Sequence, residues 1–339
     1  MFRSIYKSVR RVMPKSMKSE MTKLVFALSS KPFVKEDSIP LEKKFPGKNY
    51  QGGMIISADF ELGWAWRYSK TNPQPDKMAA LARKNFPEII RLLDEYNIPI
   101  TFATVGHLFL ESCDKGDHDW MEKIPYFDDH WRFTKGDWYD CDPYTHWGKA
   151  KHWYAPDLVK MIQNAKAKHE LATHTFTHID FSDKNCPPKV AEDEIIACID
   201  AMKPYGIRPE SIVFPGGTFG NIKVLKKRGF KIYRKNTFYD LAYPYYDEHG
   251  LIVTPTSTGL SKMHNWTASY YIKRYKTYID KALKTGTIAH FWFHPSFDEW
   301  TLKKVLPEVL RYASQKRDEG SLWIGTMKQI ADHINYKYK

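Results

Sequence analysis

Cysteine is scarce in this sequence, which has only four in 339 residues and no Cys-x-x-Cys pair. The four are Cys113, Cys141, Cys186 and Cys198. Irregular, widely separated cysteines argue against a zinc ribbon or a disulfide framework, and they are typical of proteins in a reducing compartment. We therefore expect the four to be small, buried apolar side chains.

Long apolar runs are also lacking. No window approaches the ~20 apolar residues that a membrane-spanning helix requires. Charged residues interrupt the first stretch every three or four positions, unlike the continuous apolar region of a secretory signal. We therefore expect a cytoplasmic protein, with peripheral contact at the inner membrane face as its one route to a lipid surface.

The net charge of +13 comes largely from the start of the chain. Residues 1–35 carry nine basic side chains against one acid, Glu20, and apolar residues recur at helical spacing from Phe2 to Met13. Such a helix either lies on an anionic membrane or packs on the protein body with a solvated basic face. Because the basic excess is concentrated in this segment and a later aromatic segment, residues 111–155, is rich in aspartate, we expect no nucleic-acid binding.

Short apolar runs alternate with amphipathic segments from Gly52 onward. The expected strands are 54–59, 99–104, 170–173, 211–214, 230–234, 251–254, 287–293 and 322–326. The expected helices are 76–96, 156–168, 189–203, 220–228, 266–284, 301–318 and 326–336. Repetition of strand and helix predicts an α/β fold with a parallel sheet, here a distorted (β/α)7–8 barrel. We expect residues 1–48 to be a basic amphipathic extension and 49–339 the barrel domain.

One long segment, residues 111–155, interrupts this alternation after the second strand. It contains five of the eleven tryptophans together with eight aspartates. Flat rings beside carboxylates suit sugar recognition, and they suit equally a satellite hydrophobic cluster that caps the barrel. We expect an inserted aromatic segment with one or both of these roles.

Polar residues follow the strands at the edge where parallel α/β folds place their active sites. Asp59 and Glu61 finish the first strand on one face, about 7 Å apart if the chain stays extended. His174 and His178 follow the strand 170–173, and on a helical turn their spacing would present two nitrogen ligands to zinc. Helix caps, turn acids or core hydrogen bonds would explain each pair taken alone.

Two further segments complete the candidate site. Strand 287–293 leads to His294 at the rim, where a histidine can act as a general acid, whereas His290 lies deeper and is expected to be a core residue. The sequence Phe214-Pro215-Gly216-Gly217 ends the fourth strand. Its amides could stabilise an oxyanion, or the segment could be only a tight turn.

These segments together resemble the polysaccharide deacetylases of the NodB homology type, carbohydrate esterase family 4. The matching pieces are SADFE at 57–61, ITFATVG at 100–106, HELATHTFTH at 169–178, FPGG at 214–217 and FWFHP at 291–295. The resemblance implies a distorted barrel that hydrolyses N-acetyl groups on sugars with a bound divalent metal, Zn²⁺ in first place and Co²⁺, Fe²⁺ or Mn²⁺ as alternatives.

The resemblance also implies roles for individual residues. Phe60 stands where the family has a second aspartate, so the segment looks like an Asp-x-Glu branch with Asp59 as the base. Glu61, His174 and His178 are then the metal ligands, and His294 is the acid. Pro215, Gly216, Gly217 and Trp292 would contact substrate. The converse, with Asp59 on the metal, stays open.

One family residue is missing. The arginine expected beside the base would fall on Val213, so either Arg234 or Arg67 replaces it, or metal and burial alone set the pKa of the base.

The expected substrate is an N-acetylated amino sugar on a nucleotide or lipid carrier, an intermediate of surface polysaccharide synthesis at the membrane. Two alternatives stay open. The altered first motif could leave a carbohydrate-binding protein without catalysis, or the scissile group could be another small amide, a formyl group or a ureide.

Overall fold

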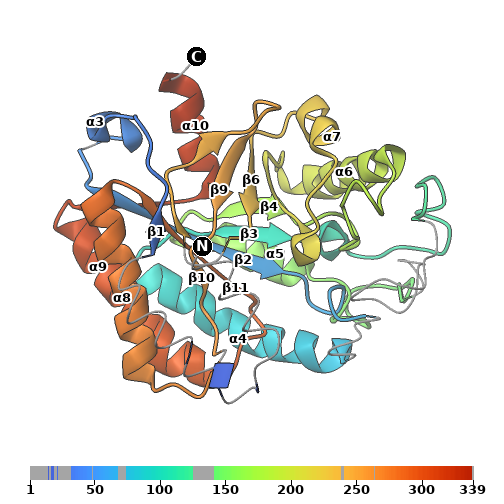
Figure 1. Ribbon diagram of the computed structural model, residues 1–339. Helices are drawn as coiled ribbons and strands as arrows, with labels where there is room; N and C mark the ends of the chain where they lie inside the picture. The colour runs from blue at the N-terminus through green and yellow to red at the C-terminus, as the bar shows by residue number, and fades with distance from the viewer. Residues whose placement is uncertain are drawn as a thin grey trace.

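The computed structural model describes residues 14, 17, 18, 21, 32–47, 49–67, 74–124, 141–237, 240–262 and 264–337 (Figure 1). The whole of the expected N-terminal amphipathic helix, Phe2 to Met13, lies outside these ranges, as do residues 125–140 of the aromatic insertion. Within the described part of the chain, no helix is long and apolar enough to cross a membrane.

A curled, mostly parallel sheet lies in the middle of the molecule with helices around it (Figure 1). Its strands are β2 (Gly52–Phe60), β3 (Thr101–Thr104), β4 (Glu170–Thr173), β5 (Ser211–Val213), β6 (Ile232–Lys235), β8 (Tyr245–Tyr246), β9 (Ile252–Pro255), β10 (Thr258–Gly259), β11 (Ile288–Phe293) and β12 (Leu322–Gly325). The strand order is β10-β11-β2-β3-β4-β5-β6-β9-β8, with β12 paired to β2. All eight expected strands are present, so the expected barrel architecture is confirmed.

The segment 252–259 joins the two sides of the sheet. Its first half, β9, pairs in parallel with β6, and its second half, β10, pairs in parallel with β11. Between them the Ser257 amide donates to the His290 carbonyl over 2.7 Å. The ring therefore runs from β2 through β6 and across this segment to β11, which pairs with β2 again.

The helices follow the expected order. They are α3 (Leu41–Lys44), α4 (Pro75–Glu95), α5 (Pro156–Asn164), α6 (Pro188–Met202), α7 (Ile222–Lys227), α8 (Ala268–Thr285), α9 (Leu306–Asp318) and α10 (Met327–Lys337), with a π turn at Thr301–Val305 and 3-10 turns η1 (Gly106–Phe109), η2 (Lys203–Tyr205) and η3 (Pro215–Gly217). A small parallel pair, β1 (Phe33–Val34) and β7 (Asp240–Leu241), lies apart from the main sheet. Through β1, α3 and the buried Phe45, residues 32–47 pack against the barrel.

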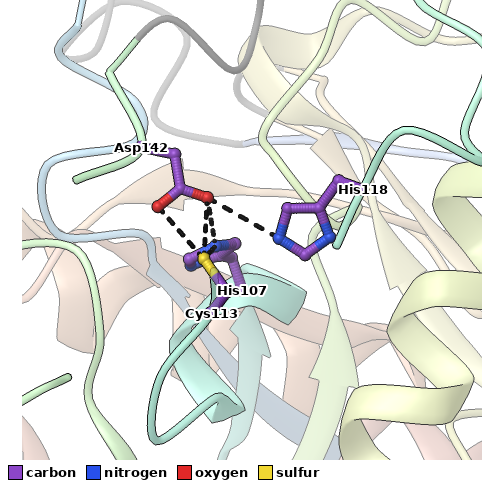
Figure 2. Close-up of side chains that lie close together, drawn as sticks. All are labelled: His107, Cys113, His118 and Asp142. Carbon is purple, nitrogen blue, oxygen red and sulfur yellow. Dashed lines mark hydrogen bonds and ion pairs between the residues drawn. The ribbon is translucent and has the colours of Figure 1, made fainter. Parts of the chain in front are cut away.

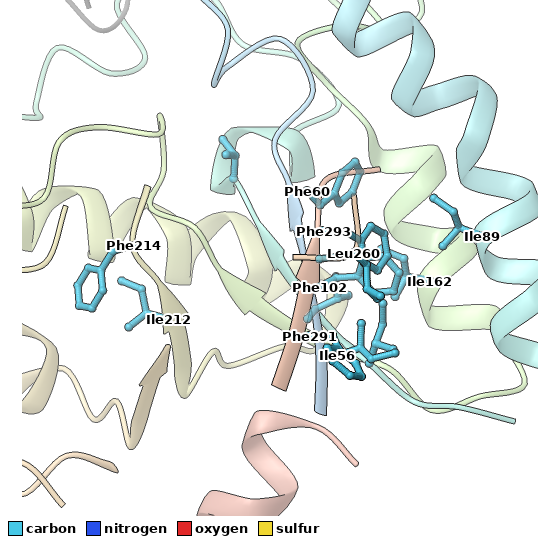
Figure 3. Close-up of a cluster of buried hydrophobic side chains, with 14 of the residues drawn as sticks. Ile56, Phe60, Ile89, Phe102, Ile162, Ile212, Phe214, Leu260, Phe291 and Phe293 are labelled. Carbon is cyan, nitrogen blue, oxygen red and sulfur yellow. The ribbon is translucent and has the colours of Figure 1, made fainter. Parts of the chain in front are cut away.

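Alternate residues of the strands face opposite sides of the barrel wall. Ile56, Phe102 and Phe291 belong to the large core between the sheet and the helices, part of which Figure 3 shows. Ile55 and Ile288 belong to a smaller apolar cluster on the other face, which fills one end of the barrel. Further along β2, Ser57, Asp59 and Glu61 share the face of Ile55. Because side chains alternate along the strand, these polar side chains lie on the same inner face as the smaller apolar cluster, but nearer the carboxyl ends of the strands.

Helix α8 lies directly against the start of β2 at Gly52. A Cβ atom there would lie 2.6 Å from both the carbonyl carbon and oxygen of Ala282. Backbone atoms cannot move aside as a side-chain end can, so we expect Gly52→Ala to lower the free energy of unfolding by about 1–3 kcal/mol. Urea unfolding would measure the loss. Substitution of the exposed neighbour Gln51 by alanine serves as the control and should change stability by less than about 0.5 kcal/mol.

Candidate metal centre and active site

Two acids end strand β2 inside the barrel. Asp59 is 4% exposed and Glu61 is 3% exposed. Buried carboxylates are costly unless they are paired, so each requires positive or hydrogen-bonding partners nearby. In the structure, Asp59 and Glu61 have different partners.

Glu61 faces three imidazoles. Its Oε2 lies 3.3 Å from His174 Nε2 and 3.1 Å from His178 Nε2, and its Oε1 lies 3.3 Å from His294 Nε2. Burial alone would raise the pKa of Glu61, but these imidazoles hold it well below its ordinary value. Glu61 is therefore an anion among nitrogen donors.

The two histidines after β4 lie on a bent loop, and the expected helical turn between them is wrong. Thr175 and His178 have left-handed backbone angles, with φ of 60° and 59°. Glu194 of α6 holds the loop by accepting hydrogen bonds from the amides of Phe176 (2.7 Å) and Thr177 (2.9 Å) and from the Thr177 hydroxyl (2.7 Å). A buried acid from another element therefore brings the two imidazoles together.

Asp59 faces an arginine. Arg234 of β6 contacts it with two nitrogens, at 2.5 and 2.7 Å, and also donates to Ser57 Oγ over 3.0 Å. Burial would raise the pKa of Asp59, but Arg234, with His174 and His294, lowers it below its usual value. His294 Nε2 lies 3.9 Å from Asp59 Oδ2.

Arg234 is the register partner of Val213 across the β5–β6 pair. The guanidinium expected at position 213 is therefore supplied by the adjacent strand. Arg67, the other candidate, instead contacts the carbonyl oxygens of Trp64 and Thr177 and so ties the turn after β2 to the histidine loop.

Two side chains of strand β11, His290 and Trp292, lie near this ion pair. His290 is fully buried and bonds to Ser57 Oγ (3.0 Å) and Thr254 Oγ1 (3.1 Å), which confirms it as a core residue. Burial and the nearby Arg234 lower its pKa to about 3, so it is neutral. Trp292 lies under the Arg234 guanidinium, 5.3 Å from its ring centroid, and beside His294.

The turn η3 at Pro215–Gly217 follows β5 and is tight. Gly216 and Gly217 have positive φ angles of 58° and 75°, and the Gly217 amide donates to the Phe214 carbonyl over 3.1 Å. Both glycines are exposed, whereas Pro215 is buried. The turn explanation is thus sound, and contact of this turn with substrate stays a prediction.

The insertion contributes aromatic packing near the site. Trp153 packs edge-on against Trp64, at 5.3 Å between ring centroids, and accepts the Trp64 indole N–H at its carbonyl over 3.0 Å. Trp120 is 51% exposed and lines a cavity of about 810 Å³. The described part of the insertion therefore combines a cluster on the barrel rim with one exposed ring. Trp131 and Trp138 lie outside the described residues.

The donor set around Glu61 suits a divalent metal. The ligand atoms of Glu61, His174 and His178 lie within 4.8 Å of one another. His174 Nδ1 donates to the Val213 carbonyl over 2.7 Å, which leaves its Nε2 lone pair directed at Glu61. Glu61 Oε1 and His174 Nε2 are buried without a hydrogen-bond partner among the described residues. Two imidazoles and one carboxylate form a common catalytic zinc set.

Comparison with known proteins agrees with this geometry. Residues 74–233 match the family model described as polysaccharide deacetylase. The match covers just under half of the chain, and over these residues the chain is similar to the polysaccharide deacetylase family. The matched residues include both histidines of the loop and the turn at 215–217, whereas Asp59, Glu61 and His294 lie outside them. A search of curated proteins gave no match.

Solved structures share the deacetylase fold. A candidate polysaccharide deacetylase from Mycobacterium smegmatis has 16% identity and a TM-score of 0.58, over 86% of this chain and 93% of the other. Another, from Pseudomonas aeruginosa PAO1, has 13% identity and a TM-score of 0.60, over 89% and 99%. Puue allantoinase has 14% identity and a TM-score of 0.59, over 89% and 95%. At these identities the likeness shows the fold alone.

Sequence reasoning did not identify a second group of potential metal ligands. His107, Cys113, His118 and Asp142 also converge within 4.8 Å. Considered alone, the cysteines gave no indication of it. Cys113, Cys186 and Cys198 are buried as expected, and Cys141 is partly exposed. Cys113, however, contacts polar atoms of Asp142 and Tyr154, so it is not merely an apolar side chain.

Proposed function

We propose that this protein is a polysaccharide deacetylase, a divalent-metal-dependent hydrolase that removes the N-acetyl group from an amino sugar. The observation that carries the proposal is the convergence of Glu61, His174 and His178 within 4.8 Å, inside a barrel whose rim also holds Asp59 and His294. Glu61, His174 and His178 would hold the ion. A bound Zn²⁺ would polarise the acetyl carbonyl and lower the pKa of water from 15.7 toward about 7.

Asp59 is the proposed base. Its bidentate contact with Arg234 keeps the carboxylate ionised and fixes its orientation, so that it can accept a proton from the attacking water. The arginine supplied by β6 supports catalysis over the alternative of a fold that only binds carbohydrate.

His294 is the proposed acid. Its side chain is 29% exposed, unlike the two buried loop histidines, so it can reach a substrate at the rim. As an imidazolium it would donate its proton to the leaving nitrogen, which departs as an amine. The Gly216 amide would stabilise the oxyanion, because Pro215 has no N–H and the Gly217 amide already donates to the Phe214 carbonyl. Trp292 would line the acetyl pocket.

The carrier of the sugar is inferred from charge. The basic residues 1–35 favour a substrate with phosphates, either a nucleotide sugar or a lipid-pyrophosphate sugar at an anionic membrane surface. The fold shared with a protein named allantoinase favours testing a ureide beside the sugars.

The test measures acetate release and metal content together in the full chain. We expect acetate from UDP-N-acetylglucosamine or a polyprenyl-pyrophosphate N-acetylhexosamine, and little from a neutral chitooligosaccharide. Glu61→Gln should lose one metal ion per chain and the activity with it. Glu95→Gln, which changes an exposed acid on α4, is the matched control and should keep both.

Retention of full activity and metal by Glu61→Gln would contradict the proposed metal centre. Release of ammonia or an amine from a ureide, with none of the acetylated sugars cleaved, would instead favour the second substrate class. Sugar binding without any turnover would favour the carbohydrate-binding alternative.

A further inference from the structure

A second cluster of metal-binding side chains lies where the aromatic insertion leaves and rejoins the barrel (Figure 2). His107 belongs to η1, just after β3, while Cys113 and His118 follow at the start of the insertion. Asp142 lies further along the insertion, 24 residues after His118. All but His118 are buried, and the His118 side chain is only 11% exposed.

Three of the side chains converge on one carboxylate oxygen of the fourth, Asp142. Asp142 Oδ2 lies 2.9 Å from His107 Nε2, 3.1 Å from Cys113 Sγ and 3.6 Å from His118 Nε2. Cys113 Sγ and His107 Nε2 are 3.6 Å apart. Ligand atoms around a tetrahedral zinc, with bonds of 2.0–2.3 Å, lie about 3.3–3.7 Å from one another. Shifts of a few tenths of an ångström in the positions of these ligand atoms would therefore give the spacing of a tetrahedral zinc site.

Surrounding groups orient these donors as the outer partners of metal ligands do. His107 Nδ1 lies 3.3 Å from the Trp153 carbonyl, and donation there leaves the Nε2 lone pair facing Asp142. Asp142 Oδ1 is occupied by the Tyr154 hydroxyl (2.9 Å) and the Tyr144 amide (3.1 Å), which leaves Oδ2 for the cluster. Without an ion, His107 Nε2–H can donate to Asp142 Oδ2 over 2.9 Å. A bound ion would take the place of that proton, and Nδ1–H would then donate to the Trp153 carbonyl.

We propose that His107, Cys113, His118 and Asp142 bind a second divalent ion, Zn²⁺ by preference, that fastens the insertion to the barrel. Thiolate, imidazole and carboxylate are its usual ligands, and four protein ligands make a closed, structural site. The Cys113 thiol releases its proton to solvent when the ion binds. His118 also lines the cavity of about 810 Å³, which offers a route of entry.

This site supports the first one mechanically. Trp64, in the turn after Glu61, packs on the His107 ring at 4.5 Å between centroids. Phe176, between the two loop histidines, packs on the rings of His107 (5.4 Å) and His118 (5.1 Å). An ion that fixes His107 and His118 therefore fixes surfaces against which both halves of the first site pack.

Cobalt titration of the metal-free full chain tests this proposal without any activity measurement. Only the second site contains a thiol, so only that site gives a thiolate-to-cobalt charge-transfer band in the near ultraviolet. We expect two Co²⁺ ions per chain and this band. The His174→Ala/His178→Ala variant should bind one ion and keep the band, so failure of the first site would be recognised separately.

The matched pair of variants is Cys113→Ser and Cys141→Ser. Cys113→Ser should lose the band and one ion, whereas Cys141→Ser, one residue from Asp142 but outside the cluster, should keep both. Absence of the band in the parent protein would overturn the proposal, and that measurement needs no variant to fold. Loss of the band in Cys141→Ser instead of Cys113→Ser would overturn it as well.

Discussion

Asp59→Asn is expected to lower kcat by about 10²–10⁴-fold while the protein keeps the metal content of the parent. Asparagine preserves the shape of the side chain and can still accept a hydrogen bond from Arg234, but it cannot take a proton from water. Because Glu61 and not Asp59 faces both His174 and His178, loss of the Asp59 charge should leave the metal ligands in place. Steady-state kinetics and metal analysis on the same preparation would measure both effects.

The exposed Asp318→Asn is the control, since its side chain is 68% exposed and remote from the strand ends. Asp318→Asn should change neither kcat nor the metal content. If Asp59→Asn lost the ion while Glu61→Gln retained it, the two acids would exchange roles, and Asp59 would be the ligand.

Arg234→Met is expected to lower the free energy of unfolding by about 3–5 kcal/mol at pH 7, because it leaves the buried Asp59 carboxylate without its cation. Arginine 234 is 2% exposed, so water cannot take its place without rearrangement. Denaturant unfolding in the presence of a chelator isolates this effect from metal binding. The exposed Arg311→Met should change stability by less than about 0.5 kcal/mol.

The same variant should show a distinct pH dependence. In the parent, the lowered pKa of Asp59 contributes stability above its unfolded value of 3.8, and this is lost as pH falls through the folded pKa. Without Arg234 the desolvation of Asp59 is no longer offset, so its pKa rises above the unfolded value and the variant loses stability as pH rises. The deficit should therefore shrink from pH 7 toward pH 4. If the loss of unfolding free energy in Arg234→Met stayed constant from pH 7 to pH 4, the ion pair with Asp59 would not be the source of the stability that Arg234 provides.

Local patterns predicted the barrel well because each strand is a short apolar run between amphipathic helices, and β2, β4 and β11 lie where those runs lie. Local patterns did not predict the structure of segments whose conformation depends on a hydrogen-bond partner distant in the sequence. The His174–His178 loop is bent because its amides donate hydrogen bonds to Glu194 on the next helix. A pattern of five residues cannot indicate that acceptor. The short strands β1, β7, β8 and β10 have two residues each, too few for a pattern to show.

The second cluster was missed for a related reason. Its ligands are spread from His107 to Asp142, with spacings that match no compact motif, and an aspartate among eight in one segment does not stand out. Only the folded path of the insertion, which returns Asp142 to the end of β3, brings them together. A search for histidine near cysteine, rather than for cysteine pairs, would have drawn attention to His107, Cys113 and His118.

The pairing of Val213 with Arg234 has a consequence for how relatives are classified. A motif scan that requires an arginine at the position of Val213 in β5 would classify this chain as inactive, although Arg234 of the adjacent strand places a guanidinium beside Asp59. In this chain the place beside Asp59 is filled by a guanidinium from β6 and not from β5. To recognise an inactive relative, one should therefore ask whether any strand places a cation beside the buried carboxylate. The residue type at a single sequence position does not answer that question.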